Sequence, residues 1–161
     1  NLLCIAEKEV FAVNEIFDPL MTAVGQHGGY RLNAQQVADF TAKAFSPPKD
    51  ANDHYHLNRD FIGKDASWLA AQIGLSIPAE TQILFGETDE HNPFVPEEQM
   101  MPFVPFVRCR NADHGIELAK EFEHGFRHTS MIHSRNIETI TVMLFLNSRM
   151  EAISHPIQQK K

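Results

Sequence analysis

Cys4 is the residue whose type and position best suit covalent chemistry. It lies in the opening segment Asn1-Leu2-Leu3-Cys4-Ile5-Ala6-Glu7-Lys8-Glu9-Val10. A cysteine thiolate is the strongest nucleophile among the side chains. A nucleophilic Cys4 would place the chain's start at its own active site, and half of any pocket would then belong to residues that precede it. Residue type alone favours the alternative, a small buried side chain. Cys109, flanked by two arginines, is predicted to be an ordinary strand residue.

Metal and phosphate chemistry have weaker sequence support. His54 and His56 are two residues apart and could bind zinc from a strand, but no third ligand has suitable spacing, so a solvated loop is favoured. Calcium would suit the carboxylates that crowd one later segment, although no EF-hand pattern is present and a solvated acidic loop is favoured. Those carboxylates are Glu87, Asp89, Glu90, Glu97 and Glu98. The sequence has no glycine-rich phosphate-binding motif. We therefore predict no metal site.

The elements that would position these residues alternate between strand and helix. Apolar runs predict strands at 9–13, 82–85, 103–109 and 130–133, and helical spacing recurs over 16–24, 37–45, 65–73, 116–122 and 136–146. Asn14, Asn33 and Asp65 are predicted helix caps. Pro105 inside a strand indicates an edge strand or a bulge. Segments 46–58 and 86–101 are predicted loops. This alternation predicts an α/β fold, a three-layer α/β/α arrangement around a mostly parallel sheet.

Composition narrows the class of protein. The chain has 161 residues, 43% of them hydrophobic, and a net charge of −7. This length and hydrophobicity suit a folded domain with a substantial core. The acidic balance argues against nonspecific nucleic-acid binding, which needs a basic surface. No apolar run approaches the roughly 20 residues that cross a bilayer. Two cysteines fit a reducing compartment, so we expect a cytoplasmic protein.

Four segments stand out in order along the chain: Asn1–Val10 around Cys4, Leu57–Ala66, the stretch from Gly86 through Pro93-Phe94-Val95 to Pro102, and Glu123–Asn136. Together they resemble one enzyme family, the CoA-acylating aldehyde dehydrogenases, in particular the propionaldehyde and acetaldehyde dehydrogenases of bacterial microcompartments. The similarity runs from Asn1 to about Met143. The resemblance implies an aldehyde-dehydrogenase catalytic-domain-like fold.

The resemblance also implies a reaction. Cys4 would attack an aldehyde carbonyl, hydride would pass to NAD, and coenzyme A would take the acyl group from the resulting thioester. Glu98 lies four residues before Pro102, the spacing of the family glutamate that contacts the nicotinamide ribose. His128 lies in a segment where this branch places a functional histidine, suited to proton transfer or thiolate stabilisation; a structural histidine is the alternative.

The sequence departs from the family at both ends. The cofactor-binding domain and an oxyanion-stabilising asparagine lie upstream of the cysteine in family members. We therefore interpret 1–143 as a partial aldehyde dehydrogenase catalytic domain and 144–161 as a divergent tail. Two functions follow: an acylating dehydrogenase domain acting on a short-chain aldehyde, or an inactive stand-alone remnant. Family membership further implies homo-oligomers in full-length relatives and microcompartment proteins as partners.

Overall fold

The computed structural model describes residues 7–50, 53–126, 130–146 and 152–154. The chain forms two compact units, Asn1–Cys109 and Arg110–Lys161. Both Cys4 and His128 lie outside the described residues.

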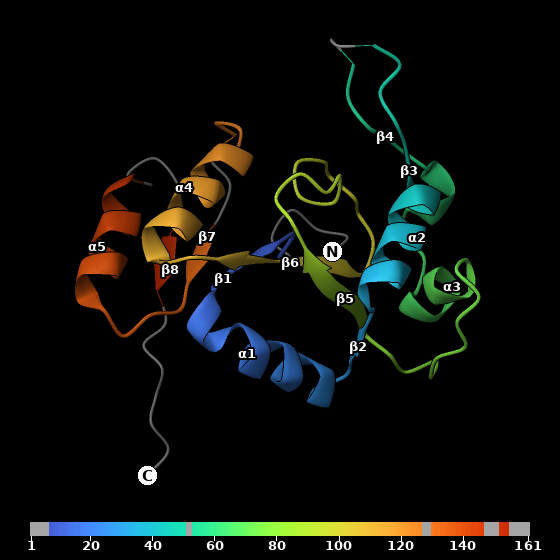
Figure 1. Ribbon diagram of the computed structural model, residues 1–161, viewed down its shortest axis with the longest axis horizontal. Helices are drawn as coiled ribbons and strands as arrows, with labels where there is room; N and C mark the ends of the chain where they lie inside the picture. The colour runs from blue at the N-terminus through green and yellow to red at the C-terminus, as the bar shows by residue number, and fades with distance from the viewer. Residues whose placement is uncertain (1–6, 51–52, 127–129, 147–151, 155–161) are drawn as a thin grey trace. The chain divides into compact units, whose positions relative to one another are not determined.

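A four-stranded parallel sheet organises the first unit (Figure 1). Its order is β1 (Val10–Val13), β6 (Phe103–Cys109), β5 (Ile83–Thr88) and β2 (Gly29–Arg31). Every neighbouring pair is parallel. The predicted parallel α/β fold is therefore confirmed. The strand β2 was too short to predict from its three residues, and it forms because β5 supplies the hydrogen-bonding edge.

Strand β6 corrects one prediction. Pro105 does not mark an edge strand, because β6 lies between β1 and β5. The register explains how the proline is accommodated: Pro105 lies opposite Gly86 of β5, whereas pairing with β1 begins one residue later, at Phe106. Proline is disfavoured in central strands because it has no N–H to donate to a neighbouring strand. Here it sits just before the second neighbour starts to pair.

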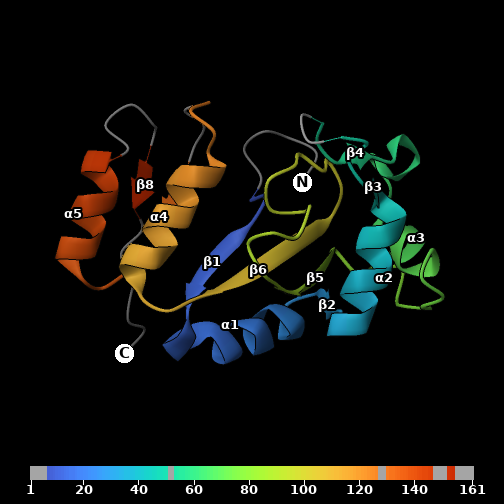
Figure 2. The same cartoon turned by 45° about the horizontal axis from the view of Figure 1, so that its top comes forward.

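Helices cover both faces of the sheet (Figures 1 and 2). They are α1 (Asn14–Gln26), α2 (Ala34–Ala44) and the short α3 (Ala66–Ala71), with a 3-10 turn at Arg59–Phe61. Asn33 caps α2 in a complete capping box with Gln36. Asp65 occupies the N-cap position of α3 without a side-chain bond. The prediction for Asn14 was wrong: Val13 is the N-cap of α1, and the Asn14 carboxamide binds Arg108 instead.

Two apolar cores lie on opposite sides of the sheet because successive strand residues point to opposite faces. Neighbours Leu84 and Phe85 of β5 belong to different cores. Phe17 and Met21 of α1 pack with Phe85 on one side, and residues of α2 and α3 pack with Leu84 on the other. This arrangement gives the three layers that the sequence predicted.

The predicted loop at 46–58 is bounded by a small antiparallel pair, β3 (Phe45–Ser46) and β4 (His56–Leu57). The second unit contains α4 (Ala112–Phe122), β7 (Ser130–Ile132), α5 (Ile137–Leu146) and β8 (Ala152–Ser154), with β7 and β8 parallel. Asn111 caps α4 by accepting from the His114 N–H. No helix in the described part of the chain is long and apolar enough to span a membrane.

Candidate functional site

Two segments that stand out in the sequence meet at the end of the sheet where β1 and β6 begin, which we call the amino edge. Lys8 lies four residues after Cys4 and two before β1 begins. The segment 89–102 follows the carboxyl end of β5 and leads to the first residue of β6. Because β1 and β6 are parallel, their starts share one edge of the sheet. Glu98, in the second half of this segment, therefore approaches the chain that leads from Cys4.

Hydrogen bonds join these two segments directly. The Lys8 ammonium donates to the carbonyl of Val95 and lies 3.1 Å from the Glu9 carboxylate. In return, the Gln99 Nε2 donates to the Lys8 carbonyl at 3.2 Å and to the Phe94 carbonyl, also at 3.2 Å. The backbone and the side chain of Lys8 are thus both bound to the segment that carries Glu98.

Aromatic packing anchors that segment to the core. Phe94 is fully buried, and its ring centroid lies 4.3 Å from that of Phe103 and 4.8 Å from that of Phe45. Asn92 closes the turn before it, accepting from the Phe94 N–H through Oδ1 at 3.1 Å and from the Val95 N–H through its carbonyl at 2.8 Å. A long loop would ordinarily be mobile, but buried aromatic contacts give this one a fixed base.

Glu98 is exposed to solvent, whereas Gln99 beside it is completely buried. Met100 then takes a positive φ of 44°, a conformation that a long side chain rarely adopts. The Met100 carbonyl accepts from the Gly63 N–H at 3.1 Å, and Met101 is buried again. Buried Gln99 thus adjoins an exposed carboxylate, which can accept bonds from hydroxyl groups.

An open cavity of about 500 Å³ adjoins the same segment through the bond from Gly63 to Met100. Its lining includes Arg59, Lys64 and Trp68, with the Lys64 ammonium 5.3 Å from the Trp68 ring centroid. These residues come from the Leu57–Ala66 segment and the start of α3. In the sequence, that segment stands out only through its resemblance to the family.

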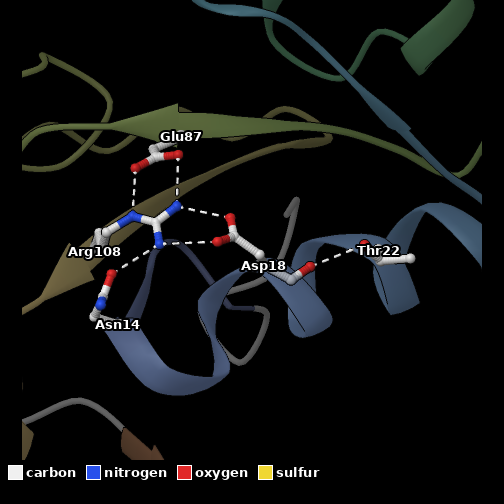
Figure 3. Close-up of polar contacts among 5 residues, drawn as sticks. All are labelled: Asn14, Asp18, Thr22, Glu87 and Arg108. Carbon is white, nitrogen blue, oxygen red and sulfur yellow. Dashed lines mark hydrogen bonds and ion pairs between the residues drawn. The ribbon is translucent and has the colours of Figure 1, made fainter.

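The predicted acidic loop needs correction at Glu87. β5 continues to Thr88, so Glu87 is a strand residue rather than a loop residue. Its carboxylate binds Arg108 at 2.8 and 3.2 Å, and Asp18 and Asn14 complete the cluster (Figure 3). All five guanidinium N–H groups of Arg108 are used. No local sequence pattern predicts this pairing, because its members are distant along the chain.

Charge pairing within this cluster moves the pKa of two members. The hydrogen bond and charge of Arg108 lower the pKa of Asp18 below its usual 3.8. Bonds to Glu87 and Asp18 raise the pKa of Arg108 above its already high ordinary value. The guanidinium also lies 3.9 Å above the Phe17 ring. With every donor occupied, this cluster is built to hold β5, β6 and α1 together rather than to bind a ligand.

The remaining sequence candidates have structural explanations. His56 Nε2 lies 3.0 Å from Asp53, and His54 lies near the same carboxylate at 4.0 Å. No group of three His, Cys, Asp or Glu suited to a metal ion occurs among the described residues. Cys109 is buried, and its thiol donates to the Val107 carbonyl at 3.6 Å. The strand assignment predicted for Cys109 is confirmed.

Individual relatives and solved structures, rather than a family model, show which family the chain belongs to. No family model matches it. The acetylating acetaldehyde dehydrogenase EutE of Escherichia coli is 40% identical over 144 residues, which cover 89% of this chain and 30% of that protein. The chain therefore spans about a third of the length of the curated relatives that it matches.

Solved structures agree. A propionaldehyde dehydrogenase from Rhodopseudomonas palustris, with bound CoA and an acylated cysteine, matches with a TM-score of 0.81 and 34% identity, covering 94% of this chain and 34% of that one. The propionaldehyde dehydrogenase of a fucose-utilisation microcompartment in Clostridium phytofermentans matches with a TM-score of 0.80 and 34% identity, covering 94% and 33%. This chain belongs to the family of CoA-acylating aldehyde dehydrogenases.

Proposed function

We propose that this chain carries the nucleophile of a CoA-acylating aldehyde dehydrogenase, which converts a short-chain aldehyde to its acyl-CoA. The proposal rests on one observation: the chain leading from Cys4 is bonded, at Lys8, to the segment that carries Glu98. Four residues of extended chain span at most about 14 Å. The length of the intervening chain therefore allows Cys4 to lie within about 14 Å of Lys8, and we propose that it shares a site with Glu98.

Cys4 is the residue that forms and breaks covalent bonds in this proposal. Its thiolate sulfur attacks the aldehyde carbonyl carbon and gives a thiohemiacetal. Loss of hydride from that carbon leaves an acyl thioester on Cys4. The coenzyme A thiol then displaces the cysteine sulfur, so that acyl-CoA leaves and the Cys4 thiolate is restored. A thioester suits this exchange because it reacts readily with a second thiol.

NAD, when bound, supplies the hydride acceptor. Glu98 fits its ribose because an exposed carboxylate can accept two hydroxyl hydrogen bonds, and the buried residues beside it hold it in place. His128 is proposed to stabilise the Cys4 thiolate or to move the proton that the incoming coenzyme A thiol releases.

The acyl-transfer half of this reaction offers a direct test, because it needs no nicotinamide cofactor. The purified chain is incubated with propionyl-CoA, and its intact mass is measured. We expect one propionyl group to be added to wild type and none to Cys4→Ala. Glu98→Gln should still be acylated, since Glu98 serves only the hydride half. Absence of acylation in wild type would contradict the proposed role of Cys4 in this chain.

Aldehyde oxidation tests the whole reaction. NADH formation is followed with coenzyme A and either acetaldehyde or propionaldehyde, because relatives are named for each substrate. Turnover that Cys4→Ala abolishes and Glu98→Gln weakens would support the full proposal. Acylation without turnover would favour the alternative, a domain that retains its nucleophile but cannot oxidise aldehydes by itself.

We propose the bacterial cytoplasm, and within it a microcompartment, as the place of action. The microcompartment named for the Clostridium relative supports this proposal. Homo-oligomers and microcompartment proteins are the proposed partners. Co-sedimentation of the chain with purified microcompartment shells, against a free-enzyme control, would test the association.

A further inference from the structure

We infer that Gln99 is a positioning residue, which fixes the distance between the Cys4 segment and Glu98. The inference rests on the proposed function and deepens it. Gln99 is the only fully buried polar side chain in the part of the chain whose burial the structure describes. Burying a polar side chain is costly unless its hydrogen bonds are made, so a buried glutamine needs a specific reason.

The bonds of Gln99 point to that reason. Its Nε2 donates to two carbonyls, that of Lys8 in the Cys4 segment and that of Phe94 in the aromatic anchor. Both partners are acceptors, so they fix which end of the carboxamide is the nitrogen. Gln99 thus links the segment from Cys4 to the immobile part of the loop, and Glu98 is its neighbour in sequence.

Two further observations show that the surroundings of Gln99 are not optimised for stability alone. The Gln99 Oε1 is buried and has no hydrogen-bond partner among the described residues. Met100, the next residue, has a positive φ. An unsatisfied buried acceptor and a strained backbone both cost stability, and such costs gather where geometry serves function. An apolar residue at position 99 would avoid the first cost but could not bind the Lys8 carbonyl.

Lys8 provides a direct readout of the link. Trypsin cleaves after lysine, so the bond from Lys8 to Glu9 is a cleavage site whose carbonyl is the very group that Gln99 binds. We expect Gln99→Met, which keeps the length and removes both donors, to be cleaved there about tenfold faster, the equivalent of about one hydrogen bond. The matched control is Gln35→Met, because Gln35 is exposed and its side chain donates to Asp39 on the same helix rather than to a distant segment.

A second measurement distinguishes a specific effect of Gln99 on Cys4 from a general loss of folding in the first unit. Alkylation of both cysteines by iodoacetamide is measured for each peptide by mass spectrometry across a pH series. Cys109 is buried in the same unit, so its protection reports whether that unit stays folded. We expect Gln99→Met to move the Cys4 profile toward that of a free cysteine, with pKa about 8.5, while Cys109 stays protected. A purely structural role would change both cysteines or neither.

Three results would overturn the inference: unchanged cleavage after Lys8, faster cleavage with an unchanged Cys4 profile, or a matching change in Gln35→Met. If Gln99→Met exposes Cys109, Lys8→Met decides the question, because it removes the ammonium contacts to Val95 and Glu9 at a partly exposed position and leaves Gln99 in place. It must shift the Cys4 profile in the same direction. Failure of acylation by propionyl-CoA would contradict the proposed function, whereas the cleavage measurement tests the link whether or not the chain is acylated.

Discussion

At each end of the parallel sheet, one side chain links segments that are distant in sequence. The amino edge is where the strands begin, and the carboxyl edge is where they end. At the carboxyl edge, Arg108 joins β6 to Glu87 of β5 and to Asp18 of α1 (Figure 3). At the amino edge, Gln99 joins the chain before β1 to the loop before β6. Both links bring together segments that are distant in sequence. The side chains of Arg108 and Gln99 differ in how completely their own polar groups are satisfied, although the buried Thr88 Oγ1 at the carboxyl end of β5 also has no hydrogen-bond partner among the described residues.

Every donor of Arg108 is used, and no backbone strain is recorded in its strand. The amino edge retains an unsatisfied buried oxygen at Gln99, a positive φ at Met100 and an exposed carboxylate at Glu98. A complete network has nothing left to offer a ligand. An incomplete and strained one is more expensive, which favours a functional explanation for its persistence.

The comparison also runs against the usual rule for open α/β sheets, whose ligands bind beyond the carboxyl ends of the strands. In this chain a saturated ion cluster occupies that end of β5 and β6. The segments that resemble the family's nucleophile and ribose-binding residues meet at the opposite edge. The proposed site therefore lies with the segments that lead into β1 and β6 rather than with those that follow the strands.

The largest expected effect concerns the aromatic base of the amino edge. Phe94→Ala removes a fully buried ring that contacts Phe40, Phe45 and Phe103, and we expect it to lower the free energy of unfolding by about 3–5 kcal/mol. Urea denaturation followed by fluorescence of Trp68 measures the change. Ile16→Ala, at a half-exposed position of α1, is the control. A loss below about 1 kcal/mol would mean that the loop is not anchored as a core element.

Substitutions of Arg108 at the carboxyl edge should lower the stability mainly through lost charge pairing rather than through lost side-chain volume. Arg108→Met leaves Glu87 and Asp18 without their shared cation, so we expect the melting temperature to fall by several degrees. Arg108→Lys should fall less, because it keeps the charge but loses the forked geometry. High salt should reduce the gap between wild type and Arg108→Met by screening these partly exposed charges. Cleavage after Lys8 should be the same in all three proteins; a change there would mean that the two edges are coupled.

A smaller effect of opposite sign is expected at Met100. Glycine adopts a positive φ without steric cost, so Met100→Gly should raise the free energy of unfolding by about 1 kcal/mol. Met100→Asn should give part of the gain, since asparagine tolerates this region better than methionine. If Met100 holds Glu98 in place, the glycine variant should also show a higher KM for NAD in any preparation that turns over. Destabilisation by both variants would show that the backbone there is not strained.

Local sequence patterns predicted the elements well where the local signal is strong. Asn33 forms the expected cap because the capping box needs only residues three apart. Asn14 failed as a cap because a distant arginine competes for its carboxamide. Pro105 failed as an edge marker because a one-residue offset in strand pairing, which no local pattern encodes, removes the conflict.

The site was predictable in part for the same reason. Glu98 was identified through the family resemblance, which places a glutamate four residues before a proline, and the structure brings its segment to the chain that leads from Cys4. Gln99 and Lys8 were missed, because their bond joins residues far apart in sequence. A glutamine between a run of acidic residues and a run of apolar ones was the one available signal. Cys4 and His128 lie outside the described residues, so their roles stay predictions.

The smallest expected effect lies away from both edges, in the loop between β3 and β4. Asp53 accepts from the Lys49 N–H at 2.9 Å and lies 3.0 Å from His56 Nε2, and these bonds lower its pKa to about 2 from 3.8. Because the folded pKa is the lower one, the carboxylate's contribution to stability is complete above 3.8 and disappears as the pH falls through about 2. Carbon-detected NMR titration of Asp53 should show that low midpoint. Asp53→Asn should be slightly less stable than wild type at neutral pH and equal to it below the midpoint. A titration midpoint near 3.8 would mean that the bonds to Lys49 and His56 do not stabilise the Asp53 carboxylate. The Arg108 cluster would then be the better example of charge pairing that contributes to stability in this chain.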